Sequence, residues 1–166
     1  MTNQEVYDKV CGHLYNQKQK AINERGDSAY KGTCGRMSPI GLFISDSVYT
    51  HSIENYDIGG LIAHHESVQK QRPLTDEEMN NLSILKEHRQ LLAHLSLIQE
   101  TTEFTTKTDI PYLYNMEKLK DNLIHAAKTY GLNSNLIEKL CEKPKGKTRF
   151  IHPDDESYDC VGIYNQ

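Results

Sequence analysis

The chain has 166 residues, of which 37% are hydrophobic and 25% are charged, and its formal net charge is −4. This length favours a single domain, and folding should bury roughly 70% of the surface that the unfolded chain exposes. The negative charge argues against a nucleic acid partner, because phosphate-binding domains carry a basic face. No segment approaches the roughly 20 apolar residues of a membrane span, and the N-terminus lacks a signal-peptide pattern. We therefore expect a cytoplasmic protein with no membrane partner.

The N-terminal segment predicts a long amphipathic helix. Thr2 and Glu5 have the spacing of a capping box, in which each side chain bonds the other residue's backbone N–H. Apolar residues then recur at three- and four-residue steps from Val6 to Ile22, which is typical of a helix with one buried face. We expect this helix to run for about five to six turns and to end near residues 24–26.

Two further long helices are predicted in the second half of the chain. A second capping box at residues 75–78 begins a leucine-rich stripe that continues, as one helix, to Thr101 or Thr102. A proline in residues 109–111 suits the first turn of the next helix, which should end at Gly131.

The remaining elements of the folded part are short. Residues 29–31 and 40–44 are expected to be extended, with a glycine turn between them, and predict a small hairpin. Shorter helices are expected at residues 58–71 and 134–142. The predicted fold class is therefore mainly α: a compact single domain of three to five helices, with a small β-hairpin insertion after the first helix.

The C-terminal region differs in composition from the rest. We assign residues 1–142 to a helical domain with the hairpin insertion, and residues 143–166 to a linker and C-terminal tail. Four alternating cations could form a secondary basic patch for an acidic partner or a phosphate: Lys143, Lys145, Lys147 and Arg149. The alternative is a solvated linker, neutralised by the acidic residues that follow. A phosphate-binding loop is excluded because Cys141 stands where its first glycine should be.

The segment at residues 28–49 carries a motif of glycines and tyrosines. Eight residues fall at the spacings of Cys-x-Tyr-Arg-Gly, a glycine turn, Cys-x-Ile-Gly, Ile-Pro-Asp and Tyr: Tyr30, Lys31, Gly32, Gly35, Gly41, Ile44, Asp46 and Tyr49. In this motif, and over about two thirds of its length, the chain resembles a widespread family of small uncharacterised bacteriophage and prophage proteins. Ser28 and Ser38 stand where that pattern has its two cysteines, so any role those cysteines share is absent or changed here.

The resemblance suggests a general role for the protein but no enzymatic activity or mechanism. It suggests a non-enzymatic phage accessory protein that binds and modulates a bacterial host target in the infected cell, such as a counter-defence inhibitor. The alternative is a small-molecule binding module that sequesters a nucleotide-like signal in a pocket lined by tyrosines and by Lys31, Arg36 or Arg72. An enzyme with an unrecognised site is the third hypothesis.

The candidate binding residues lie in the same segment, because loops that bear aromatic and cationic side chains on a rigid scaffold are common binding surfaces. The predicted ligand- or partner-binding set is Tyr30, Lys31, Arg36, Asp46 and Tyr49. The alternative is that both tyrosines pack on the first helix while the charged side chains are solvated.

No catalytic residue, cofactor or metal is predicted. The four cysteines are far apart in sequence and form no Cys-x-x-Cys pair. The run His64-His65-Glu66 places neighbouring side chains about 100 degrees apart on a helix, so they do not form one ligand face. His88 falls within the leucine stripe and is expected to be a hydrogen-bonded residue at the edge of the core.

Overall fold

A computed structural model describes residues 1–106 and 110–142 of the chain. Within these residues there are six α-helices: α1 (Asn3–Gln17), α2 (Ile58–Gln71), α3 (Asp76–Glu87), α4 (Arg89–Thr101), α5 (Met116–Thr129) and α6 (Asn135–Glu142). The mainly α class is confirmed. The predicted number of three to five helices is wrong, and no hairpin forms in the described part of the chain, which has only isolated β-bridges.

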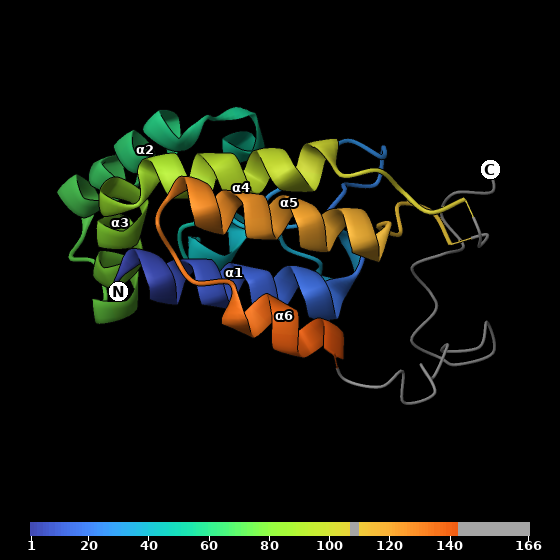
Figure 1. The fold of residues 1–166 in the computed structure, drawn as a ribbon. Coiled ribbons are helices and arrows are strands. Elements are labelled where there is room, and N and C mark those ends of the chain that lie inside the picture. The colour runs from blue at the N-terminus through green and yellow to red at the C-terminus, as the bar shows by residue number, and fades with distance from the viewer. Residues whose placement is uncertain (107–109, 143–166) are drawn as a thin grey trace.

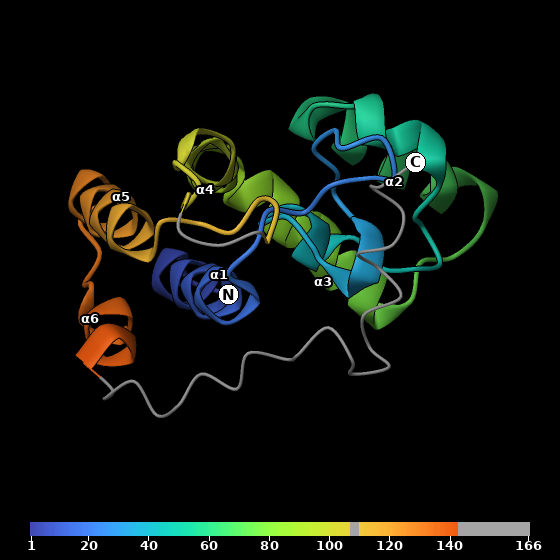
Figure 2. The same ribbon diagram turned by 90° about the vertical axis from the view of Figure 1, so that its right-hand side faces the viewer.

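Four of the helices form a bundle. The axes of α1, α4, α5 and α6 are roughly parallel, with α5 running opposite to the other three, and α3 crosses them at one end (Figure 1). Figure 2 views the bundle nearly along its axes and shows α2 and α3 on one side of it. The segment at residues 18–57 lies between the bundle and α2, and contains three short 3-10 turns: η1 (Thr33–Gly35), η2 (Gly41–Phe43) and η3 (His51–Asn55).

The core is made by the facing apolar stripes of these helices. Its members from α1, α4 and α5 include Val6, Val10, Leu14, Leu91, Leu92, Leu95, Ile98, Leu119 and Leu123. Burying each such side chain stabilises the fold by about 1.5–3 kcal/mol. Tyr7 is fully buried among them, and its hydroxyl donates a hydrogen bond of 2.9 Å to the Leu123 carbonyl. This bond satisfies the one polar group that Tyr7 brings into the core.

The first helix begins as predicted but ends earlier. The capping box of Thr2 and Glu5 is present. The helix stops at Gln17, where Lys18 adopts a left-handed backbone with φ of 60°. The following residues are extended because they pair with a distant segment: the Tyr114 N–H donates to the Lys18 carbonyl at 2.9 Å. Ile22 is buried as the apolar pattern requires, but outside any helix.

The second predicted helix is two helices. Its capping box at Thr75 and Glu78 is present, but the backbone breaks at His88, between α3 and α4. The His88 ring hydrogen-bonds to the Asn3 side chain at 2.6 Å and to the Met1 carbonyl at 2.8 Å, as expected for a residue at the core edge. The break lets α4 pack on α1 and α5 while α3 packs on α2.

The third predicted helix begins later than expected. Asn115 caps α5, while Tyr112 has φ of 58° and the Lys20 N–H donates to its carbonyl. The pairing with the segment after α1 therefore keeps residues 110–114 out of the helix. Gly131 ends the helix region as predicted, with φ of 64°, a conformation that glycine adopts without strain. The predicted start near residues 109–111 falls partly outside the described residues.

Isolated contacts replace the predicted hairpin. Ile22 bridges Ser28 and Lys31 bridges Met37, but neither bridge extends into a ladder. The chain instead folds tightly on itself at Gly41, where a Cβ atom would lie 1.9 Å from the Tyr30 carbonyl oxygen. Gly41 is therefore required by a close backbone approach, which is a physical reason for its place in the motif.

We predict that Gly41→Ala destabilises the protein by about 2 kcal/mol or more, because the added methyl group forces two backbone segments apart. Gly12→Ala is the matched control: no atom lies within 4 Å of the added Cβ, and alanine favours a helix interior. Urea unfolding of both variants measures the difference. Equal stability of Gly41→Ala and the parent protein would contradict the close approach.

Candidate binding site

The side chain of Glu54 organises the segment between α1 and α2. Its Oε2 accepts a hydrogen bond of 2.6 Å from the Tyr30 backbone N–H, and its Oε1 accepts bonds from the Lys31 N–H and the Tyr49 hydroxyl. The sequence pattern did not indicate Glu54, because its partners Tyr30 and Lys31 are more than twenty residues away in the chain. We call Glu54, Tyr30, Lys31, Asp46 and Tyr49 the Glu54 cluster.

Two opposite charges lie on the outer side of the cluster. The Lys31 ammonium forms an ion pair with Asp46 and lies 5.4 Å from the centre of the Tyr49 ring. The hydrogen bond and charge of Lys31 lower the pKa of Asp46. The Asp46 side chain is nevertheless 97% exposed, while that of Lys31 is only 18% exposed. This pair is therefore accessible to a partner mainly through the aspartate.

The two tyrosines of the cluster are partly buried, and their hydroxyls form hydrogen bonds. Burial, with a contribution from the charge of Glu54, raises the pKa of Tyr30 to about 12. Burial and the hydrogen bond to Glu54 likewise raise the pKa of Tyr49. Both rings also belong to the rim of the hydrophobic core. Each tyrosine therefore packs on the core, as the alternative hypothesis expects, and also borders the charged surface of Lys31 and Asp46.

Arg36 lies apart from the other predicted residues. Its guanidinium donates to the Thr33 carbonyl at 3.1 Å and to the Thr33 hydroxyl at 3.0 Å, which folds it back on the turn at η1. Four of the five predicted residues therefore gather around Glu54, and Arg36 does not. The basic patch from Lys143 to Arg149, and the assignment of residues 143–166 to a linker and tail, lie outside the described residues.

A cavity of about 230 Å³ opens beside the cluster, between residues 28–40, Glu54 and helix α4. Ser28 and Ser38, the two positions where the phage pattern has cysteines, both line it. The Ser28 hydroxyl donates to Glu100 at 2.6 Å, and the Ser38 hydroxyl accepts from the Gly41 N–H at 3.0 Å. In this chain the two positions therefore carry hydrogen-bonding groups.

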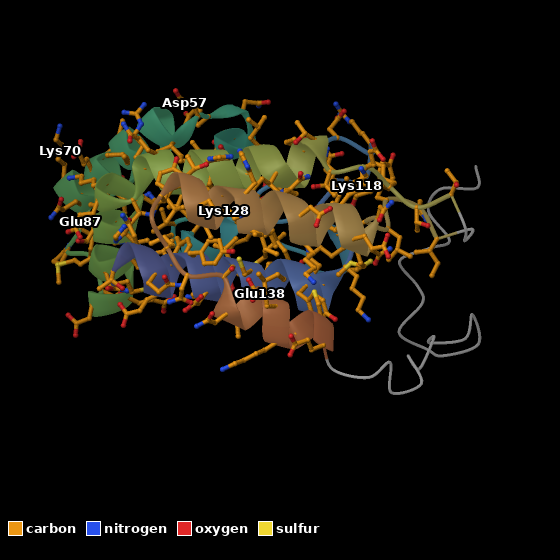
Figure 3. All side chains as sticks on the ribbon, viewed as in Figure 1. Asp57, Lys70, Glu87, Lys118, Lys128 and Glu138 are labelled. Carbon is orange, nitrogen blue, oxygen red and sulfur yellow. The ribbon has the colours of Figure 1, made fainter. Side chains whose placement is uncertain are left out.

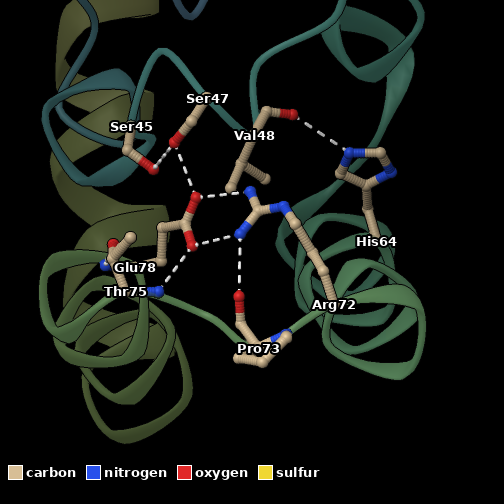
Figure 4. Close-up of polar contacts among 8 residues, drawn as sticks. All are labelled: Ser45, Ser47, Val48, His64, Arg72, Pro73, Thr75 and Glu78. Carbon is tan, nitrogen blue, oxygen red and sulfur yellow. Dashed lines mark hydrogen bonds and ion pairs between the residues drawn. The ribbon is translucent and has the colours of Figure 1, made fainter.

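A second carboxylate, Glu78, fixes the other end of the segment (Figure 4). It is fully buried at the start of α3. Its two oxygens accept hydrogen bonds from the two terminal guanidinium nitrogens of Arg72, at 2.6 and 2.8 Å. The Ser47 hydroxyl and the Thr75 N–H also donate to it. These donors, Arg72 first, lower the pKa of Glu78. The network joins residues 45–48 to the turn between α2 and α3.

The adjacent histidines of α2 point to different surroundings. His64 donates to the Val48 carbonyl at 3.1 Å (Figure 4), whereas His65 is fully buried and bonds the Leu61 carbonyl at 2.9 Å. Burial lowers the pKa of His65. Among the described residues, no group of three or more His, Cys, Asp or Glu side chains is arranged to hold a metal ion.

Charges of both signs project from the helices of the bundle face. Figure 3 labels Lys118 and Lys128 on α5, Glu138 on α6 and Glu87 at the end of α3, and these side chains are mixed rather than separated by sign. In the described part of the chain, no helix combines the length and apolar character needed to cross a membrane.

Comparison with protein-family models, curated proteins and solved structures finds no match for this chain. The resemblance of residues 28–49 to the phage family therefore stays a prediction.

We predict that Glu78→Gln lowers the melting temperature at pH 7 by at least about 5 °C, because Arg72 loses its buried anionic partner. A carboxyl whose pKa is lowered by folding stabilises the protein above its usual pKa of about 4.3, and this contribution is lost as pH falls. The difference in melting temperature between parent and variant should therefore be largest near pH 7 and should decrease below about pH 4.3.

The control is Glu66→Gln, which removes an exposed carboxylate paired with Lys86 on the neighbouring helix. Its effect on the melting temperature should be small, because exposed ion pairs contribute under about 1 kcal/mol. Thermal unfolding of all three proteins from pH 7 to pH 3 gives the comparison. If the difference in melting temperature between the parent and Glu78→Gln stays constant over this range, the charge of the carboxylate is not what stabilises the loop.

Proposed function

We propose that this protein binds a bacterial host protein and modulates it by occupancy, as a non-enzymatic phage accessory protein. The observation that supports this proposal most is the Glu54 cluster, in which one carboxylate holds two backbone amides and a tyrosine in place beneath an exposed ion pair. A surface ordered before binding loses less conformational entropy when a partner docks.

The composition of the surface around the cluster also supports recognition of a protein. The Tyr30 hydroxyl donates to the Tyr56 carbonyl, and the Tyr56 ring is itself 40% exposed. Tyrosines with a fixed polar end are enriched among residues that dominate binding energy. The exposed Asp46 adds a charge that could select a partner with a complementary cation.

A nucleotide-like ligand has less support. The cations expected to line its pocket have other partners: Lys31 and Arg72 are paired with carboxylates. Arg36 contacts Thr33. The cavity itself is bordered by Glu54 and Glu100, whose negative charges would repel a phosphate.

We predict that the double variant Lys31→Ala/Asp46→Ala keeps the stability of the parent within about 1 kcal/mol, because it removes both charges together and leaves neither without its partner, and because Asp46 is exposed. It should weaken binding to the host target by at least about tenfold, since charge-assisted contacts are worth roughly 1.5–3 kcal/mol each. The measurement is affinity capture from bacterial lysate, identification of the retained protein, and titration of that protein in purified form.

The matched control is Glu66→Ala/Lys86→Ala, which removes a half-exposed ion pair between α2 and α3. It should bind the target like the parent protein. Equal binding by both double variants would exclude the Glu54 cluster as the recognition surface. Turnover of the target by the parent protein would overturn the proposal of action by occupancy.

A further inference from the structure

The cavity beside Glu54 contains buried hydrogen-bonding groups without partners. Gln99 lines the cavity and is only 1% exposed, yet its Oε1 accepts no hydrogen bond from the described residues. The hydroxyl of Ser96, one helical turn earlier on α4, is likewise buried without a partner there. Buried polar groups are nearly always satisfied in folded proteins, so these two atoms are positions where a molecule in the cavity can form hydrogen bonds.

Two of the donors that border the cavity are engaged: the Tyr30 N–H is bound to Glu54, and the Ser28 hydroxyl is bound to Glu100. The Ser38 oxygen accepts from the Gly41 N–H. The unpaired atom of Gln99 is an acceptor, its Oε1, so a molecule that satisfies it has to bring a hydrogen-bond donor.

The charge of the cavity wall is negative. Glu54 receives three hydrogen bonds, all from neutral donors, and in the described part of the chain no cation lies within ion-pair distance of it. Glu100 is paired with Lys20 at 2.5 Å, and Lys20 is not among the residues that line the cavity. A half-buried carboxylate without a counter-ion favours a positively charged ligand.

We propose that this cavity binds a small primary ammonium compound, such as an aliphatic diamine, whose N–H groups donate to Glu54 and to Gln99 Oε1. Its volume of about 230 Å³ lies below the roughly 300–1,000 Å³ of pockets for drug-sized molecules, which restricts the ligand to a few heavy atoms. This proposal does not rest on the proposed host target, although the cavity shares Glu54 with the Glu54 cluster.

The probe is putrescine, followed by amide chemical shifts in two-dimensional NMR of the full chain. Saturable shifts are expected at residues 28–30, 38–40 and 96–100. The neutral analogue 1,4-butanediol has the same length and no charge, and should cause no such shifts at equal concentration. Equal shifts with both compounds, shifts confined to other residues, or no saturation with putrescine would each overturn the proposal.

The variant Gln99→Met keeps the length of the side chain and removes the unpaired oxygen. It should weaken putrescine binding by at least about tenfold, the effect of losing one hydrogen bond to a charged group. Gln90→Met, an exposed position on the same helix, should bind like the parent protein. If Gln99→Met does not fold, Ser96→Ala provides the same test. Unchanged affinity in the folded cavity variant would overturn the assignment.

Discussion

Two carboxylates, Glu54 and Glu78, hold a segment that has neither an α-helix nor a strand. Residues 18–57 form no regular ladder, so their backbone groups are satisfied by scattered backbone–backbone bonds and by side chains. Glu54 accepts from two backbone amides near one end, and Glu78 binds Ser47 and the turn before α3 near the other. The shape of the candidate site depends on these two anchors.

The helices supply the rigid support that makes this arrangement possible. α3 crosses the end of the bundle (Figure 1). Its Glu78 side chain binds Ser47 of the loop, while Gln99 of α4 lines the cavity. Because the backbone breaks at His88, one leucine-rich stretch forms two helices that pack in different directions. A single straight helix could not pack on α2 and on α1 and α5 at once.

Glu54 connects the outer surface with the inner cavity. Its carboxylate orders the backbone of Tyr30 and Lys31 and also borders the space lined by Gln99. The exposed ion pair of Lys31 and Asp46 therefore stands on a backbone whose position depends on a group in the cavity wall. Recognition of a host protein and of a small ammonium compound would draw on the same carboxylate from opposite sides.

The sequence alone determined the helical class, the two capping boxes, the helix at α2 and the end at Gly131, because each depends on residues within a few positions of one another. It also placed all five candidate residues in one segment, of which four gather around Glu54. Tertiary structure decided the early end of α1, the break at His88, the absence of a hairpin and the role of Glu54. Each of these rests on bonds between residues distant in the chain, such as Tyr114 to Lys18 and His88 to Asn3, which local periodicity does not encode.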